Sequence, residues 1–293
     1  MFEQQVVNGL MLGSSYALVA VGYTLVFGVL KLLNLAHGEV FMFGGYIGFF
    51  LLATVDVPAW AAILGAMVGA GLISLLLERI SFRPIDLTRY EIAPVLSTIG
   101  FALMLQQLVV RIWGSTPEPV SAGIADLDIR IGSVLISFVS LLGLVIALVL
   151  MVVLGLVIRR TGFGRGMRAI ADDAEVAELL GVDTRRIVLV TFGISGVLAG
   201  AAGVLAALRT GSVAPYVGMD VGFKALAVMV IGGLGSFEGA VLAGLVLGVL
   251  EVLAVAYGSA AYGDAVVWGT LLLVLVARPS GLFGEPAHVS GRA

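Results

Sequence analysis

The sequence predicts an all-α, polytopic membrane protein, folded as one bundle of transmembrane helices over residues 1–293. Composition and the pattern of apolar residues both indicate this fold. Hydrophobic residues make up 60% of the 293 and charged residues only 12%, with a mean hydropathy of +1.13. Soluble domains carry roughly 25% charged residues, so this chain has too few to coat a water-soluble globule. Its apolar runs are continuous and approach the ~20 residues that cross a bilayer, whereas a β-barrel has short alternating segments.

The composition also limits the chemistry that the chain can carry. It contains no cysteine, which excludes disulfides, cysteine-ligated zinc and iron–sulfur clusters. A net charge of −3 gives no sign of a nucleic-acid partner. The sequence has no Walker lysine motif, no H-E-x-x-H pattern and no recognisable Ser/His/Asp set. We therefore expect neither an enzyme nor a chain that binds its own metal or cofactor.

Eight apolar runs have the length of a membrane span or nearly so, and a further run, Phe223–Gly233, is about half as long. The prediction is eight spans if this half element is re-entrant, and nine if it crosses. The eight expected spans are Asn8–Leu30, Glu39–Val55, Trp60–Leu77, Ile92–Ile112, Ser133–Ile158, Ile187–Leu208, Gly239–Tyr257 and Asp264–Ala277.

The distribution of positive charge predicts that the N-terminus lies outside. Lysine and arginine favour the cytoplasmic side of membrane proteins, and the first positive charge follows the first apolar run. In this orientation Arg130 and Arg209 fall outside, with Arg111 at a helix end. The residues that fall inside are Lys31, Arg79, Arg83, Arg89 and the six arginines of residues 159–186.

The polar stretch 159–186 lies between two spans on the predicted cytoplasmic side. Its 28 residues hold six of the 16 lysines and arginines and five of the 19 acidic residues. The four arginines at 159–168 lie at the membrane edge, as topology determinants do. A charged loop of this size in a membrane protein indicates a contact with something in the cytoplasm.

Within this loop the sequence predicts a short helix over roughly Asp173–Gly181. Asp172 or Asp173 can cap its start, and Gly181 suits its end. Small and apolar residues exposed on one side suit insertion into a groove of a partner. The alternative is a helix that lies on the membrane surface or on its own bundle. The face in question holds Ile170, Ala174, Ala177 and Gly181, with Val176, Leu179 and Leu180 beside it, and the charges are Asp172, Asp173, Glu175 and Glu178.

A polar break, Asn34–Glu39, separates the first two spans. It places an amide, an imidazole (His37) and a carboxylate within six residues. Asn34 can cap the next helix, and Glu39 near that helix's start is favoured by the helix dipole. The functional alternative is that this break lies beside a transport route through the bundle. A metal site is not expected, because one histidine and one glutamate are too few ligands.

The glycine-rich segment Gly232–Gly239 predicts a bend between the half element and a full span. It lacks the preceding strand and the following lysine of a nucleotide-binding loop. Gly232, Gly233 and Gly235 are therefore expected to form a hinge, of the kind found beside broken helices in transporters.

Four charged residues lie close to this segment or in the span that follows it. Asp220, Lys224 and Glu238 are expected at the membrane boundary, with Lys224 reaching out to the headgroups. Glu251 lies deeper in its span and is the better candidate for a buried functional charge, although it could also hydrogen-bond a neighbouring helix.

Glycines recur at four-residue spacing in several spans. In lipid such pairs let helix backbones approach closely, so we expect them to pack the bundle rather than to line a pathway. The pairs are Gly44/Gly48, Gly65/Gly69, Gly196/Gly200 and Gly244/Gly248.

Three stretches together resemble the permeases of branched-chain amino-acid ABC importers. They are NLAHGEVFMFGGY at 34–46, GRGMRAIADDAEVAELLGVDTRRI at 164–187 and PYVGMDVGFKALAVMVIGGLGSFEGAVLAGLVLG at 215–248. The resemblance runs from about residue 5 to 284, and within the family the chain looks like the shorter of the two usual permeases. Its short tail, Glu285–Ala293, departs from typical members and receives no role.

The resemblance implies a multi-pass subunit in a prokaryotic plasma (inner) membrane. Two permeases, identical or different, would form the pathway, two ATPases would use ATP on the cytoplasmic side, and an external binding protein would deliver leucine, isoleucine or valine. Related permeases carry urea or short amides. The resemblance gives the role of contacting the ATPases to Asp173, Glu175, Ala177, Glu178, Leu180 and Gly181. The polar residues Asn34, His37, Glu39 and Glu251 are the candidates for the pathway.

Two other classes of function remain open from the residues alone. An ion-coupled carrier or channel for a small polar solute would place Glu251 or Lys224 on an ion path. A polytopic membrane enzyme would need convergent reactive side chains, and the sequence offers few.

Overall fold

A computed structural model describes residues 2–85, 92–121, 128–131 and 134–284. In these ranges the chain forms eleven α-helices, one π-helical turn and four short strands. The helices are α1 (Phe2–Leu30), α2 (His37–Ala53), α3 (Ala59–Leu77), continued by the π-helical turn Glu78–Phe82, α4 (Ile92–Trp113), α5 (Phe138–Arg160), α6 (Gly162–Asp172), α7 (Ala174–Leu179), α8 (Thr184–Thr210), α9 (Val217–Gly232), α10 (Phe237–Tyr257) and α11 (Ala260–Ala277). The strands are β1 (Glu118–Pro119), β2 (Asp128–Ile131), β3 (Val134–Ser137) and β4 (Ser212–Val213).

Seven of these helices are long and apolar enough to cross a membrane by length and composition: α1, α3 with its π-helical turn, α4, α5, α8, α10 and α11. The helix α2 is apolar but has only 17 residues. The prediction of a helical membrane bundle is confirmed, and each expected span corresponds to one helix, with ends shifted by a few residues. Of the residues used to predict topology, Arg89 lies outside the described part of the chain, as does the tail 285–293.

The expectation of a purely helical chain is wrong in detail, because the described residues include two small antiparallel sheets. Glu118 pairs with Val213, and Asp128–Ile131 pairs with Val134–Ser137. The fifth span was expected from Ser133, which is outside the described residues, but α5 begins at Phe138. The intervening Val134–Ser137 is held as a strand, since Leu135 exchanges two hydrogen bonds with the side chain of Gln4, at 2.7 and 2.8 Å.

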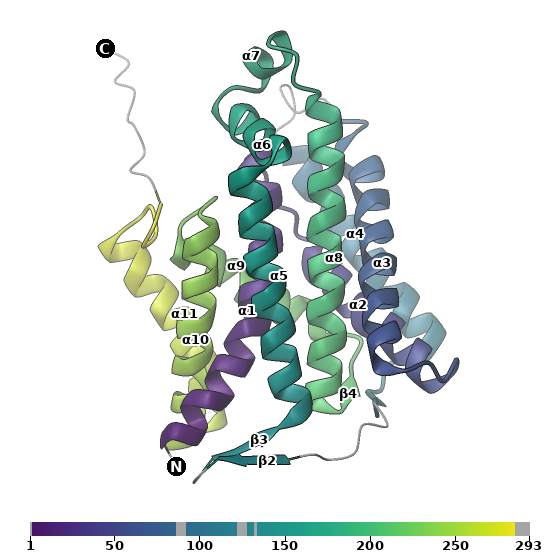
Figure 1. The fold of residues 1–293 in the computed structure, drawn as a ribbon, viewed down its shortest axis with the longest axis vertical. Coiled ribbons are helices and arrows are strands. Elements are labelled where there is room, and N and C mark those ends of the chain that lie inside the picture. Colours follow the sequence, from purple (N-terminus) through teal and green to yellow (C-terminus); the bar gives the residue numbers. More distant parts are fainter. Residues whose placement is uncertain (1, 86–91, 122–127, 132–133, 285–293) are drawn as a thin grey trace.

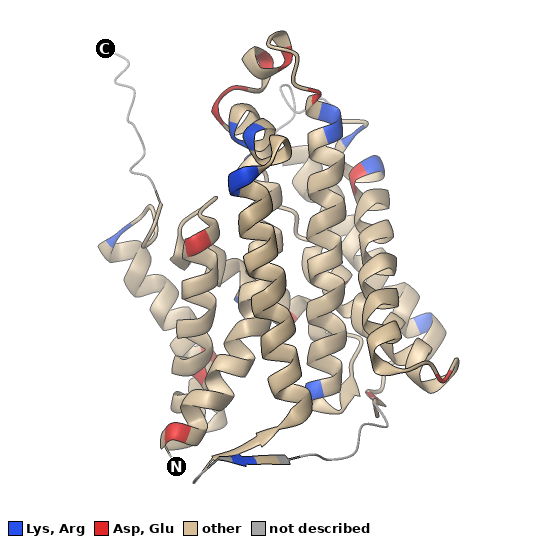
Figure 2. Ribbon diagram, viewed as in Figure 1, with Lys and Arg blue, Asp and Glu red and all other residues tan. Residues whose placement is uncertain are grey.

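The two ends of the bundle differ (Figure 1). The N-terminus and the strands β2, β3 and β4 gather at one end, and α6 and α7 project from the other. Charged residues concentrate near the ends of the helices, while the middle of the bundle is almost free of them (Figure 2). The polar loop 159–186 and the N-terminus therefore lie at opposite ends of the molecule.

The centre of the bundle is α1, which packs against α5, α8, α9 and α10. Glycines allow the closest approaches. A Cβ atom at Gly44 would lie 2.6 Å from Gly200 Cα, and one at Gly248 would overlap Gly13 of α1. The paired glycines thus serve helix packing, as predicted. Gly65 and Gly69 receive side chains of α2 in the same way.

A short C-terminal segment completes the end of α9. The backbone N–H groups of Leu282 and Phe283 donate to the carbonyl oxygens of Ile231 and Gly232, at 2.9 and 3.0 Å. Carbonyls in the last turn of a helix lack intrahelical partners, so this segment satisfies two of them. Nothing in the local sequence signals this pairing, because it joins residues about 50 positions apart.

Candidate functional site

The break between α1 and α2 is folded into the bundle rather than exposed as a loop. Lys31 turns the chain with a left-handed backbone, φ +56°. Asn34 accepts a hydrogen bond from Ala36 N through its side-chain oxygen, at 3.2 Å. Because α2 begins one residue later, at His37, Asn34 stabilises the turn before the helix and does not cap the helix itself. No side chain caps α2. The prediction of an Asn34 cap is therefore wrong.

His37 is completely enclosed, with 0% of its surface exposed. Its Nδ1 lies 3.3 Å from Ser195 Oγ, which in turn donates to the carbonyl of Gly22 at 3.0 Å. The ring of Tyr23 packs edge-on against the imidazole, with centroids 4.7 Å apart. The histidine thus joins α1, α2 and α8 and fixes the polar break against the other two helices.

Glu39 is the charged residue of the break, and it lines a cavity together with Leu35. It is 5% exposed, and this cavity of about 200 Å³ is also lined by Tyr23, Gln106 and Phe223. Its Oε2 has no hydrogen-bond partner among the residues that the structure describes. A buried carboxylate without a partner is costly, so this cavity is a candidate site for a polar or cationic group.

The starts of α2 and α9 meet backbone to backbone beside this cavity. A Cβ atom at Gly38 would lie 2.8 Å from Gly222 Cα and would overlap the carbonyl of Gly218. The first turn of α2 therefore meets α9 inside the bundle. This contact was not predicted, because these glycines lie about 180 residues apart.

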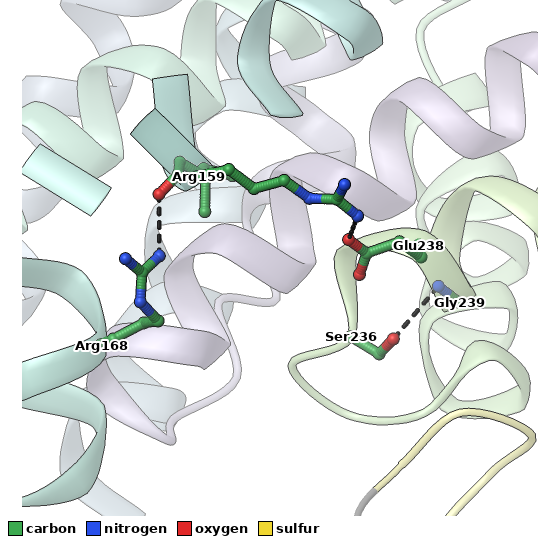
Figure 3. A network of polar contacts seen from close by, with 6 residues as sticks. Arg159, Arg168, Ser236, Glu238 and Gly239 are labelled. Carbon is green, nitrogen blue, oxygen red and sulfur yellow. Dashed lines mark hydrogen bonds and ion pairs between the residues drawn. The ribbon is translucent and has the colours of Figure 1, made fainter. Parts of the chain in front are cut away.

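The predicted hinge at Gly232–Gly239 is a tight turn between α9 and α10. Gly233 and Gly235 have φ values of +109° and +84°, in the region that favours glycine. Ser236 Oγ accepts a hydrogen bond from Gly239 N at 3.1 Å and so caps α10 (Figure 3). Gly232 ends α9 against the backbone of Gly239. The predicted bend is confirmed as a turn.

Lys224 lies inside the bundle and binds acidic residues of its own and neighbouring helices. Its Nζ lies 3.0 Å from Glu251 of α10, 2.8 Å from Asp264 of α11 and 3.9 Å from Asp220 of α9. We call these four residues the Lys224 joint. Lys224 and Glu251 are both buried, so the prediction that Lys224 reaches out to the headgroups is wrong. The buried position predicted for Glu251 is confirmed, and its partner is Lys224.

The loop 159–186 contains two helices where one was predicted. The unpredicted one, α6, starts at a Thr161 cap and packs so closely on the end of α5 that a Cβ atom at Gly164 would overlap the carbonyl of Ile158. The three glycines of GFGRG have low helix propensity. Packing on α5 outweighs that low helix propensity.

The predicted short helix is present as α7. Asp173 Oδ1 accepts from the N–H groups of Glu175 and Val176, both at 3.0 Å, which confirms the cap. Gly181 follows the helix with φ +88°. Leu179 and Leu180 are 86% and 79% exposed, whereas Ala177 is 2% exposed.

The apolar surface of α7 therefore differs from the face drawn from the sequence. Of the predicted face, Ala174 and Gly181 are exposed, whereas Ala177 and Ile170, which belongs to α6, are buried. The large exposed apolar side chains are Val176, Leu179 and Leu180. The acidic residues Glu175 and Glu178 are exposed beside the leucines. Two neighbouring leucines in the open at one end of the bundle are an unusual surface and suit contact with another protein.

Two arginines connect this loop to the helices below it (Figure 3). Arg168 of α6 donates to the carbonyl of Ile158 at 2.8 Å, near the end of α5. Arg159 reaches across to Glu238 in the first turn of α10. The arginines expected only as topology determinants thus also join α6, α5 and α10.

Comparison with known proteins agrees with these features. The family model described as "Branched-chain amino acid transport system / permease component" matches residues 5–275. The high-affinity branched-chain amino acid transport system permease protein LivH of Salmonella typhimurium is 37% identical, over 97% of this chain and 96% of that protein. The corresponding permease protein BraD of Pseudomonas aeruginosa has the same identity and coverage. The solved structure of PsaBC from Streptococcus pneumoniae has a similar fold, with a TM-score of 0.50 and 11% identity over 92% of this chain and 90% of that one.

Proposed function

The chain belongs to the family of branched-chain amino acid transport permeases, and we propose that it forms part of the translocation pathway of an ABC importer for leucine, isoleucine and valine. The observation that carries this proposal is α7, a capped helix with two exposed leucines at the end of the bundle opposite the N-terminus. In this assignment separate subunits bind and hydrolyse ATP, and this chain binds no cofactor.

The proposed topology has the N-terminus outside and nine crossings. Two contacts support a crossing by α9, which has only 16 residues. Before α9, Val213 pairs with Glu118 of β1, at the end of the bundle that holds the N-terminus. After it, Glu238 pairs with Arg159 beside the loop 159–186. A segment that joins the two ends favours nine crossings over eight, with Arg278 on the inner side.

The proposed coupling surface to the ATPases consists of Glu175, Val176, Glu178, Leu179 and Leu180. Asp173 and Gly181 fix the ends of α7, and Ala177 anchors it from below. Force on α7 would pass to the bundle through α6, which is bonded to the end of α5 by Arg168. To reverse a two-state equilibrium from 1:99 to 99:1 takes roughly 5.5 kcal/mol of differential binding, which an ATP-dependent contact would have to supply here.

The proposed pathway passes the cavity of Glu39. Glu39 faces it directly, while Asn34 and His37 hold the break in place behind it. Glu251 does not line this cavity. Its link to the pathway is its ion pair with Lys224 of α9, the helix beside the cavity. Exposed apolar residues at the same cavity, Met219 and Phe223 among them, would face lipid or the second permease.

The proposed assembly lies in a prokaryotic inner membrane and contains a second permease, two ATPases and an extracytoplasmic binding protein. Its test is reconstitution of the full complex in liposomes. We expect uptake of radiolabelled leucine that requires both ATP and the binding protein. Uptake by this chain alone, driven by an ion gradient without ATP, would instead establish an ion-coupled carrier.

A further inference from the structure

A second cavity, of about 280 Å³, lies at the end of the bundle that holds the N-terminus, between α1, α2, α8 and α9. It is just below the range of roughly 300–1,000 Å³ that drug-sized ligands occupy, so its size suits a smaller solute. Most of its wall is apolar, with Leu12, Phe41, Val217 and Val221 among the lining residues. Such a wall suits an aliphatic side chain.

Two residues of opposite charge also line this cavity. Arg209 enters from the last turn of α8, and Asp220 from the first turn of α9. The Asp220 side chain is 63% exposed, and its contact with Lys224 is the longest of the Lys224 joint, at 3.9 Å. Hydroxyl groups of Ser15, Tyr16 and Thr210 complete the polar part of the wall. Opposite charges on the wall of one small apolar cavity match a zwitterion that carries an aliphatic group.

Arg209 is the more unusual of the two charges. Arginines are depleted on the outer side of membrane proteins, yet this one stands at the outer end of α8 and is partly buried. Its Nε has no hydrogen-bond partner within the described part of the chain. Buried guanidinium groups are normally paired, and their planar fork matches a carboxylate. The Nε–H group is therefore open to an anionic ligand, because no described residue accepts a hydrogen bond from it.

We propose that this cavity receives the amino acid on its way in, with Arg209 facing the carboxylate, Asp220 facing the ammonium group and the apolar wall holding the aliphatic side chain. The proposal rests on the function proposed above, because it takes the imported solute to be a branched-chain amino acid. It assigns a substrate-selecting role to two residues at the outer end of α8 and α9, separate from the Glu39 cavity.

The test uses the lack of natural cysteines in this chain. A Ser15→Cys variant, assembled in the full complex in nanodiscs, is labelled with a membrane-impermeant maleimide, and labelling of this chain is followed over time. We expect leucine to slow the labelling. Leucinamide, which lacks the carboxylate, and 4-methylpentanoate, which lacks the ammonium group, should protect far less. A Leu135→Cys variant on the exposed strand β3 should label at the same rate with and without leucine.

The variants Arg209→Gln and Asp220→Asn, each combined with Ser15→Cys, test whether each of the two charges contributes to leucine binding. Each should raise the leucine concentration for half-maximal protection by about tenfold or more, the loss expected when a hydrogen bond to a charged group is removed. The matched controls are Arg130→Gln on β2 and Asp56→Asn in the α2–α3 turn, which should leave protection unchanged.

The failure of this proposal can be told from failure of the proposed function. If the wild-type complex imports leucine with ATP but leucine never protects Ser15→Cys, the cavity site is wrong and the function stands. The site is also wrong if Arg209→Gln weakens binding of the binding protein to the complex while leucine protection is unchanged, since Arg209 would then be a docking residue. If the wild-type complex imports no leucine, the proposed function itself fails.

Discussion

The Lys224 joint and the loop helix α7 are both rich in charge, and they use it in opposite ways. In the joint, a buried lysine and a buried glutamate bond each other between α9 and α10, and Asp264 of α11 and Asp220 of α9 add two further contacts to the lysine. In α7, the acidic residues are exposed, and apart from the Asp173 cap they serve no internal bond in the described structure. In these two regions, therefore, the buried charges hold helices together, and the exposed acidic residues of α7 are free for a partner.

The largest effect is expected from Lys224→Met. This change removes the cation and leaves Glu251 buried without its partner, and breaking a buried ion pair costs about 3–5 kcal/mol. We expect a loss of folded protein, measured by size-exclusion chromatography in detergent and by the thermal unfolding midpoint. The double variant Lys224→Met/Glu251→Gln should recover part of the stability. A stable single variant would show that the joint does not hold the helices together.

Changes in α7 should abolish function without loss of fold. Gly181→Pro cannot adopt the φ of +88° found there, and Glu178→Arg reverses a charge on the exposed surface. We expect both variants to reach the membrane at wild-type levels, to lose ATP-dependent leucine uptake and to retain less ATPase on purification. Leu135→Ser, at an exposed leucine of the opposite end, is the control. Normal uptake by both α7 variants would show that the exposed charge and the end of α7 are not needed for contact with the ATPases.

A smaller effect is expected from loss of the α7 cap. Asp173→Ala leaves the N–H groups of Glu175 and Val176 without their acceptor, and a lost cap costs about 1 kcal/mol. Because α7 is exposed, this cost should appear as faster amide hydrogen exchange in residues 174–179 and as partial loss of uptake, with no change in the unfolding midpoint of the bundle. Asp173→Asn keeps the acceptor and should behave almost as wild type.

The smallest effect is expected from Arg159→Gln. Its ion pair with Glu238 is exposed to solvent, and such pairs contribute about 0–1 kcal/mol. The unfolding midpoint should therefore hardly move, in contrast to the Lys224 joint. A large drop would mean that this link between α5 and α10 is structurally as important as the joint.

The same comparison explains what could be predicted from the sequence. The spans follow from apolar runs, and α7 follows from a cap and a terminal glycine that lie within nine residues of each other. These are local signals. Two partners of Lys224 lie 27 and 40 residues away on other helices. The local pattern therefore predicted that this lysine reaches out to the headgroups, whereas it is buried. The spans carry few charges, and those of Lys224 and Glu251 are opposite in sign. A comparison of how deep these two residues lie in their spans could therefore have suggested that they pair.

Packing also decided the other features that the sequence did not reveal. The helix α6 forms on a glycine-rich segment because it packs on α5. Glu39 faces a cavity, while His37, two residues earlier, is enclosed by Gly22 and Ser195. Periodicity within one short polar segment cannot separate these two outcomes, since both depend on helices from distant parts of the chain.

The most direct test of the central claim is a cross-link from α7 to an ATPase. With no natural cysteine in the chain, Leu179→Cys provides one defined attachment point for a photoactivatable cross-linker in the assembled complex. We predict a cross-link to the ATPase subunit whose yield changes on addition of ATP, and none from Leu135→Cys at the opposite end. Attachment of Leu179→Cys only to lipid or to this chain itself would contradict the claim that α7 is the surface through which ATP drives transport.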